Sequence, residues 1–410
     1  MPKHVALVGA DLFPAYFELA RGLKQVGARV TGIGATGTVG ALPAALKPWL
    51  DAWEPVSSLT DPQAIADAAR RAARAGRGLD RLETGDENLV VPTAEARAAL
   101  GLPGLSMRTA VLCRDKPAMK EALRAAGLPC AESAAVASLG ELEAFAARVG
   151  YPLAVKPRAG LGSLGTRRVD DANDLRAAAR ALGVDQGRSA AVEEWIEGHE
   201  GFFDTLTIGG TVAHEFIAHY YPPVLQALAD RALSPQIAAT NRVEVESYRE
   251  LREVGRQVIA ALGIDTAATH MEWFFGSKGL KVSEIGARPA GERIWDLYCV
   301  GNDMDVWREW AMAVVHGRPG ARPSRRLATG SVQVRPDRDG RIVRYEGLHE
   351  VLAAIKPYAF QHHLPKPGTP TDPIYKGYLN NVWFRLRHPD YDALRGLMDF
   401  VGQTLKVRAA

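Results

Sequence analysis

Cysteine is scarce in this sequence, and long apolar runs are absent. The three cysteines, Cys113, Cys130 and Cys299, form no C-x-x-C pair, and an odd number spread this widely predicts neither a disulfide framework nor a zinc motif. No segment approaches the ~18 consecutive apolar residues of a membrane span. The first residues also lack the apolar length and the small-residue cleavage site of a signal peptide. We therefore predict a cytoplasmic protein that has no membrane partner.

A strong charge of one sign is absent as well. The chain carries 50 Lys and Arg against 47 Asp and Glu, a net charge of +3, and it has no stripe in which basic and aromatic residues alternate. Both observations argue against nucleic acid as a partner. What the sequence does have is a hydrophobic fraction of 47% over 410 residues. That length suffices for about two to four domains at roughly 100–200 residues each.

The order of predicted elements indicates a multidomain chain of the α/β and α+β classes. Residues 4–35 read as strand, helix and strand, which predicts a parallel sheet, and we place this α/β domain at 1–108. The segment 109–320 changes to helices mixed with hairpins, and we take it as a second domain. A linker rich in Gly, Pro and Arg (317–326) leads into a small α+β lobe at 321–410.

A glycine-rich loop lies inside the second domain, in "AVKPRAGLGSLGTRRV" (154–169). Glycine lets backbone N–H groups approach an anion closely, and Lys156 just upstream supplies a point charge for phosphate oxygens. The loop joins two predicted strands rather than a strand and a helix, so it fits neither the Walker loop nor the dinucleotide fingerprint. On its own it reads equally well as a hairpin turn without a ligand.

Two glutamates further along suggest a cation site. Glu272 and Glu284 lie on predicted strands at 269–275 and 280–285, and antiparallel pairing would bring both carboxylates to one face. Close carboxylates repel unless a cation lies between them, and Mg²⁺ bound by one or two carboxylates plus substrate phosphates is a common arrangement. The alternative is two solvated glutamates opposite nearby lysines. Arg288 follows, and its planar guanidinium suits a carboxylate or a phosphate, or an ordinary structural ion pair.

A third feature is "VEEWIEGHE" (192–200), where a predicted strand that stops at Gly198 carries Glu193 and Glu194, and Glu200 follows a turn. Adenine needs a flat apolar slot and an acceptor for its amino group, and ribose hydroxyls need a carboxylate. The same charges also suit the edge of a solvated strand. Lys116, in "CRDKPAMKEAL", reads by itself as a lysine on a helix surface.

Taken in order, these motifs resemble the ATP-grasp superfamily. The match consists of Lys116, "KPRAGLGSLG", "EEWIEGHE", "MEW" and "SEIGARPAG", and it covers residues 109–316, about half of the chain. The domain before it resembles the usual pre-ATP-grasp domain. The form "EIGARPAG" is similar to the carboxylate–amine ligase branch, which includes L-amino-acid ligases.

The resemblance implies an ATP-dependent ligase that joins a small-molecule carboxylate to an amine, such as two amino acids. It implies an amide or peptide bond formed through an acyl phosphate, release of ADP and phosphate, ATP and Mg²⁺ (with Mn²⁺ as an alternative ion), and a homodimer. The implied phosphate-binding groups are Lys116, Lys156 and the backbone amides of Gly162, Ser163 and Leu164. The implied adenine and ribose groups are Glu193, Glu194, Trp195, Ile196 and Glu200. Glu272 and Glu284 would bind the metal, and Arg288 and Lys156 would act in catalysis.

One position departs from the superfamily pattern. The second acidic motif often reads E-x-N, whose asparagine completes the magnesium site, but here Gly286 stands in place of the asparagine. This departure keeps open a non-catalytic ATP-binding or regulatory protein as an alternative. A carboxylase or formate-using enzyme of the same fold is the other. A nicotinamide-dependent oxidoreductase is disfavoured, because the first strand is not followed by G-x-G-x-x-G.

Overall fold

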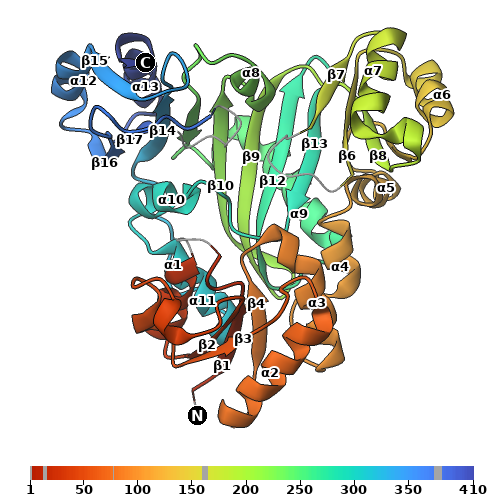
Figure 1. The fold of residues 1–410 in the computed structure, drawn as a ribbon, viewed down its shortest axis with the longest axis vertical. Helices are drawn as coiled ribbons and strands as arrows, with labels where there is room; N and C mark the ends of the chain where they lie inside the picture. The colour runs from red at the N-terminus through yellow and green to blue at the C-terminus, as the bar shows by residue number, and fades with distance from the viewer. Residues whose placement is uncertain (1, 13–15, 77, 159–164, 374–380) are drawn as a thin grey trace.

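A parallel sheet opens the chain, as predicted. The computed structural model describes residues 2–12, 16–76, 78–158, 165–373 and 381–410. The first sheet has the strand order β3-β2-β1-β4, with every neighbouring pair parallel, and it forms the lower part of Figure 1. Its elements are β1(His4–Val8), α1(Tyr16–Gln25), β2(Arg29–Gly34), β3(Ala52–Pro55), α2(Pro62–Gly76), β4(Arg81–Thr84) and α3(Val90–Ala99). The four-residue strands β3 and β4 were not predicted, because they are too short to show a hydrophobic period.

A small antiparallel sheet with two helices packed against it forms the upper right of Figure 1. Its strand order is β5-β8-β6-β7, and the helices α4 and α5 lead into it. The elements are α4(Met107–Leu112), α5(Lys116–Ala125), β5(Ser133–Val136), α6(Leu139–Val149), β6(Leu153–Pro157), β7(Arg167–Val169), α7(Ala172–Leu182) and β8(Ala190–Glu194). Because β6 pairs with β7, the predicted strand–loop–strand context of the glycine-rich loop is confirmed.

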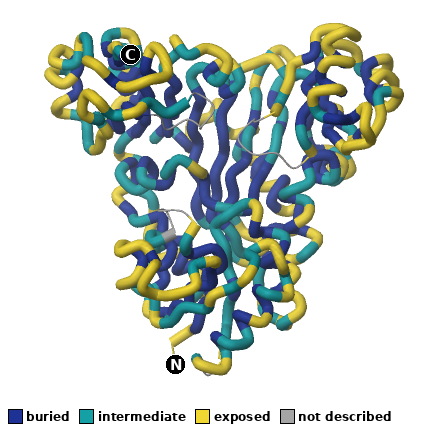
Figure 2. The backbone as a smooth tube through the Cα atoms, in the orientation of Figure 1, coloured by how far each residue is buried: buried dark blue, intermediate teal, exposed yellow. Residues whose placement is uncertain are grey.

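A large antiparallel sheet runs through the middle of the molecule, with the order β13-β12-β9-β10-β11-β14-β17-β16. Its central strands are among the most buried parts of the chain (Figure 2). The first six elements are β9(His199–Ile208), β10(Thr211–Tyr221), α8(Val224–Ala229), β11(Gln236–Ala239), α9(Arg249–Leu262) and β12(Ala267–Gly276), followed by β13(Gly279–Gly286). The predicted hairpins β9–β10 and β12–β13 both form.

The C-terminal segment contributes strands to this same sheet. β14(Ala328–Val334), β16(Ala359–His363) and β17(Val382–His388) extend it, whereas β15(Ile342–Glu346) and β18(Lys406–Ala409) form a separate pair beside α12(Leu348–Ile355) and α13(Tyr391–Thr404). The sequence predicted an α+β lobe here but not its continuity with the central sheet. The boundaries at 108 and 320 stay predictions.

Two helices connect the large sheet to the N-terminal sheet. The sequence predicted one helix at about 303–316, and the structure has α10(Ile294–Asn302) and α11(Val306–His316). α11 packs closely on α1, because Gly22 lies against it: a Cβ at Gly22 would be 2.6 Å from the carbonyl oxygen of Trp307. Within the described residues, no helix is long and apolar enough to cross a membrane.

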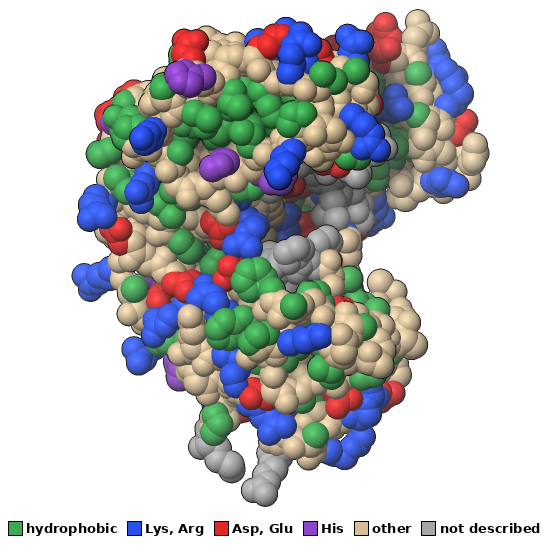
Figure 3. All heavy atoms as spheres, turned by 60° about the vertical axis from the view of Figure 1, so that its left-hand side comes forward, with side chains coloured by type: hydrophobic (Ala, Val, Ile, Leu, Met, Phe, Trp, Pro, Cys, Tyr) green, Lys and Arg blue, Asp and Glu red, His purple; other side chains and the backbone are tan. Residues whose placement is uncertain are grey.

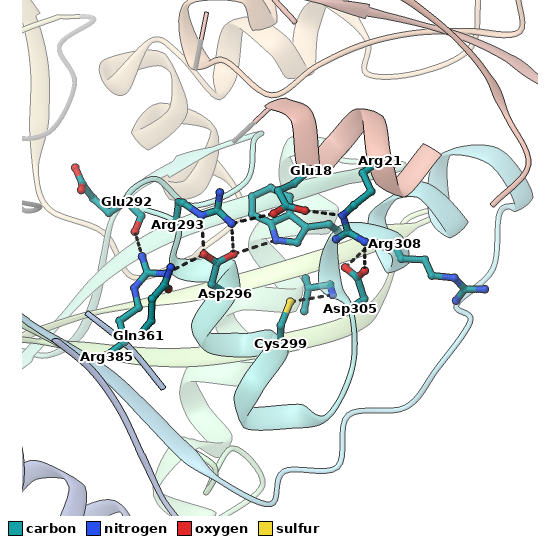
Figure 4. Close-up of polar contacts among 12 residues, drawn as sticks. Glu18, Arg21, Glu292, Arg293, Asp296, Cys299, Asp305, Arg308, Gln361 and Arg385 are labelled. Carbon is teal, nitrogen blue, oxygen red and sulfur yellow. Dashed lines mark hydrogen bonds and ion pairs between the residues drawn. The ribbon is translucent and has the colours of Figure 1, made fainter. Parts of the chain in front are cut away.

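The carboxylate of Asp296, on α10, joins three parts of the fold (Figure 4). Its Oδ2 accepts a hydrogen bond from Arg293 Nε at 2.6 Å and from Arg385 Nη1, on β17, at 2.8 Å. Arg293 also donates to Glu18 on α1 at 3.0 Å, and Arg385 Nη2 donates to the Glu292 carbonyl at 3.0 Å. The N-terminal helix, the central segment and the C-terminal strand therefore meet through one partly buried network.

Candidate active site

A cavity of about 360 Å³ lies between the small sheet and the central sheet. It brings together nine of the predicted site residues: Lys116, Lys156, Glu193, Glu194, Trp195, Ile196, Glu200, Glu272 and Glu284. The surface drawn in Figure 3 is also hollowed between the N-terminal part, at the bottom, and the parts above it, but no described residue before Lys116 lines the cavity. Residues separated by well over a hundred positions thus line one space.

The two predicted metal ligands face each other across paired strands. Glu272 on β12 lies directly opposite Glu284 on β13, beside a register shift between Glu272 and Trp273. Lys116 Nζ lies 3.0 Å from Glu284 Oε2. Burial alone would raise the pKa of Glu284, but Lys116 and Lys156 outweigh burial and hold the pKa below its usual value. These two glutamates therefore line the cavity as a pair rather than lying apart in solvent.

Magnesium fits this pair in number and in chemistry. No group of three or more His, Cys, Asp and Glu side chains that could hold a metal occurs among the residues described. Mg²⁺ keeps several waters and is often held by only one or two carboxylates plus phosphate oxygens. Two oxygen-bearing side chains at the edge of a roomy cavity meet that requirement.

A buried charge cluster forms one wall of the cavity. Glu193 Oε2 lies 2.6 Å from Lys120 Nζ and 2.8 Å from Lys156 Nζ. Burial would raise the pKa of Glu193, but the two lysines hold it at about 2, whereas burial lowers the pKa of Lys120 to about 8. Lys120 was not predicted. The available signal was its spacing, because Lys116 and Lys120 are four residues apart on α5 and therefore share a face.

The second oxygen of Glu193 supplies a test of nucleotide fit. Glu193 Oε1 is buried and has no hydrogen-bond partner among the described residues. An unpaired buried acceptor is costly unless a ligand pairs with it. The amino group of adenine is a donor of the required kind, so the side chain fits the predicted role at this point.

The segment after Glu193 differs in detail from the prediction. The strand β8 ends at Glu194, four residues before the predicted end at Gly198, and 195–198 continues without regular structure. The Trp195 N–H donates to the Pro152 carbonyl at 3.2 Å. This N–H is therefore already bonded, and a backbone hydrogen bond to adenine would have to come from another group of the segment. Arg168 stacks over the Trp195 ring at 5.0 Å. Glu194 pairs with Lys278. Lys278 is one of the nearby lysines in the alternative interpretation, in which Glu272 and Glu284 are two solvated glutamates.

Glu200, the predicted ribose ligand, is 4% exposed on β9. Its Oε2 accepts a hydrogen bond from the Val224 N–H at 2.6 Å. Burial raises the pKa of Glu200 to about 8, and the neighbouring Glu272 adds to the rise. The side chain lines the cavity, but one of its carboxylate oxygens already accepts the Val224 bond, and the ribose role stays a prediction. The predicted phosphate-binding amides of Gly162, Ser163 and Leu164 lie outside the described residues.

Arg288 does not line the large cavity. It lies in a small adjoining pocket with Glu284, Gly286 and Glu87. Its Nε donates to Glu87 Oε2 at 2.8 Å and its Nη1 donates to the Pro289 carbonyl at 2.8 Å. Burial would lower the pKa of Arg288, but Glu87 outweighs burial and raises it, so the guanidinium stays charged. Glu87, from the N-terminal segment, was not predicted.

A buried histidine whose partners were not predicted lies beside the acidic pair. His270, on β12, bonds through Nδ1 to Asp204 Oδ1 at 2.7 Å, and the Tyr298 hydroxyl donates to Asp204 Oδ2 at 2.7 Å. Burial lowers the pKa of His270, but Asp204 outweighs burial and raises it to about 9. The sequence predicts a packed or hydrogen-bonded histidine here rather than a ligand, and the structure has His270 hydrogen-bonded.

The chain is similar to several known proteins. The family model of the carbamoyl-phosphate synthase L chain, ATP binding domain, matches residues 115–197, which include Lys116, the glycine-rich loop and Glu193. The L-arginine-specific L-amino acid ligase of Bacillus subtilis is 25% identical over 308 residues, 74% of this chain and 73% of that protein. The alanine–anticapsin ligase of Bacillus subtilis (strain 168) is 24% identical over 271 residues, 56% of each chain.

The structure agrees with the sequence similarity. The L-amino acid ligase from Bacillus licheniformis has a TM-score of 0.75 at 21% identity, over 100% of this chain and 99% of that one. In its motifs, in the matched ATP-binding model and in its fold, the chain resembles the ATP-grasp superfamily. The predicted fold class and the predicted ATP-dependent carbon–nitrogen ligase are confirmed as well. ATP-grasp ligases use ATP and Mg²⁺, as the resemblance implied. The use of Mn²⁺, the homodimer and the cytoplasmic location stay predictions.

Proposed function

We propose that this ATP-grasp ligase joins the carboxylate of one amino acid, or of a similar small metabolite, to the amine of another. The observation that carries the proposal is the position of Glu272 opposite Glu284 in the same cavity as Lys116 and Lys156. Two carboxylates and two lysines are the groups that polyphosphate and its metal ion require. The similarity to amino-acid ligases supports amino acids as the substrate class.

Each side chain suits one part of the reaction. Glu272 and Glu284 would hold Mg²⁺, which supplies positive charge to the phosphate oxygens when bound. Lys116 and Lys156 would bind phosphate oxygens and offset the charge that shifts during phosphoryl transfer. Glu193 would accept a hydrogen bond from the adenine amino group, and Glu200 one from a ribose hydroxyl.

The reaction balances with ATP and the two substrates alone. A carboxylate oxygen of the first substrate takes the γ-phosphoryl group, which gives an acyl phosphate and ADP. The amine nitrogen of the second substrate then attacks the acyl carbon, phosphate leaves, and the nitrogen loses one proton. Arg288, which stays charged, would bind the first substrate's carboxylate and then the acyl phosphate. A closed site excludes water, which would otherwise hydrolyse the acyl phosphate.

The first experiment measures ADP and phosphate release from ATP and Mg²⁺ with and without pooled amino acids. We expect release that depends on the pool and a product whose mass equals two pool members minus one water. Smaller pools then identify the two substrates. A clear thermal shift with Mg-ATP but no stimulation of ADP release by any pool would favour the non-catalytic alternative.

Replacement of Glu284 by glutamine is expected to abolish most of this turnover. The change removes one of two carboxylates and leaves Lys116 without its 3.0 Å partner. Loss of even an indirect partner of a metal ligand costs 10–100-fold, so we expect about a hundredfold or more in substrate-dependent ADP release. Glu246→Gln is the matched control, because Glu246 is 79% exposed and pairs only with its helical neighbour Arg249. Equal turnover in both variants would show that the reaction does not need the Glu284 carboxylate.

A further inference from the structure

The position that departs from the superfamily pattern faces a carboxylate from another part of the chain. A Cβ built on Gly286 would lie 3.4 Å from Glu87 Oε2 and 3.6 Å from Glu87 Cδ. Glu87 begins the short helix η3(Glu87–Leu89), directly before α3. The carboxylate of Glu87 thus lies within van der Waals contact of the first side-chain atom that any other residue at 286 would have.

Both oxygens of Glu87 are committed to arginines. Oε2 accepts from Arg288 Nε at 2.8 Å, and Oε1 accepts from Arg114 Nη1 at 2.6 Å. The Glu87 side chain is 11% exposed, so these charge-assisted bonds are shielded from water and stronger than surface pairs. A carboxylate held between two guanidinium groups is a poor candidate for a substitute metal ligand. Glu87 is instead suited to hold the guanidinium groups of the two arginines in place.

The contact with Glu87 determines which donors of Arg288 remain available. Nε is used by Glu87 and Nη1 by the Pro289 carbonyl, whereas Nη2 makes no hydrogen bond to any residue that the structure describes. A guanidinium is planar, so fixing Nε and Nη1 also fixes the direction of Nη2. Held in this way, Arg288 can present a preset donor to a carboxylate, and positioning of this kind lowers the entropy cost of reaction.

We propose that Glu87 is the positioning residue of Arg288, and that glycine at 286 keeps a competing polar side chain away from the Glu87 carboxylate. The inference rests on the proposed function, because it assigns Arg288 to the substrate carboxylate. An asparagine at 286, the usual residue of the superfamily pattern, would bring an amide donor to Glu87 Oε2 and compete with Arg288 Nε for it. The missing side chain is thus part of an arrangement that orients Arg288.

The kinetic test compares Glu87→Gln with Glu54→Gln in full-length protein, with the substrates found in the pool assay. Glu54 is the matched control, because it accepts from Arg71 Nε at the same 2.8 Å in the N-terminal sheet, away from the cavity. We expect Glu87→Gln to lower kcat/KM for the carboxylate substrate about 10–100-fold, as for other partners of site residues, with KM for ATP unchanged. Gly286→Asn should act in the same direction, and the double variant should lose less than the product of the two effects.

A second measurement does not depend on turnover. Phenylglyoxal modifies accessible guanidinium groups, and peptide mass spectrometry gives the rate at Arg288 itself. We expect the rate at Arg288 to rise severalfold in Glu87→Gln and to stay unchanged in Glu54→Gln. An unchanged rate overturns the positioning role even if no substrate is ever found. If the parent protein turns over and Glu87→Gln has the same kcat/KM, the positioning role is wrong and the ligase function stands. Absence of any parental turnover counts against the ligase function alone.

Discussion

Replacement of Glu193 by glutamine is expected to lower the free energy of unfolding by about 3–5 kcal/mol, the usual effect of breaking a buried ion pair on one side. Lys120 is fully buried and Lys156 is 8% exposed, and both ammonium groups lie within 2.8 Å of Glu193 Oε2. Glutamine keeps the shape but removes the charge that compensates them. The effect is measurable as a lower denaturant midpoint or melting temperature.

The neighbouring residue supplies the control. Glu194 pairs with Lys278, whose side chain is 59% exposed, so Glu194→Gln should cost less than about 1 kcal/mol. Equal destabilisation by the two substitutions would show that the buried cluster is no more important than a surface pair. Because the substitutions are adjacent and chemically identical, differences in expression or strand propensity do not confuse the comparison.

The pH dependence of this effect has a defined sign. The pKa of Glu193 falls from its usual 4.5 to about 2 in the folded protein. A carboxyl whose folded pKa is depressed contributes stability that is fully present above its unfolded pKa and is lost as pH falls toward the folded value. The stability difference between parent and Glu193→Gln should therefore shrink between pH 4.5 and pH 2, and remain constant from pH 5 to pH 7.

Local patterns in the sequence were enough to predict much of the fold. Glycines at 209–210 and at 276 and 279 mark turns, and the residues on either side alternate or run apolar, so the hairpins β9–β10 and β12–β13 followed directly. The turn spacing also predicted that Glu272 and Glu284 could share one face, and the structure has them directly opposite each other. Such features depend on residues close together in sequence, whose geometry is fixed by the period of a strand.

The features that were missed depend on distant residues. Glu87 and Arg288 are 201 positions apart, and neither residue type indicates its partner. Likewise, nothing local in β14 or β17 shows that these strands continue the central sheet rather than form a sheet of their own. Lys120 is the exception, because its helical spacing from Lys116 was visible. Its role depends on the burial of Glu193, which no local pattern reveals.

The last prediction concerns the carboxylate that joins the three parts of the fold. Asp296→Asn would leave Arg385, whose side chain is 2% exposed, without the carboxylate that it contacts at 2.8 Å and would weaken both bonds from Arg293. We expect a loss of about 3–5 kcal/mol in the free energy of unfolding, again because a buried charge loses compensation. Asp67→Asn is the control, because Asp67 is 52% exposed and pairs with its helical neighbour Arg70.

The same substitution should loosen the turn that follows Arg288. Glu292 and Arg293 have φ values of 53° and 55°, a left-handed conformation that costs non-glycine residues about 1–3 kcal/mol each and persists only where the surroundings enforce it. The enforcing contacts are those in Figure 4: Arg293 to Asp296, and Arg385 to the Glu292 carbonyl. With Asp296 neutral, the turn can relax, and limited trypsin digestion should cut after Arg293 faster in Asp296→Asn than in Asp67→Asn. Equal cleavage rates in the two variants would mean that the packing of the turn, and not the Asp296 carboxylate, keeps it in this conformation. In that case the contact of Arg385 with Asp296 would not stabilise this end of the site.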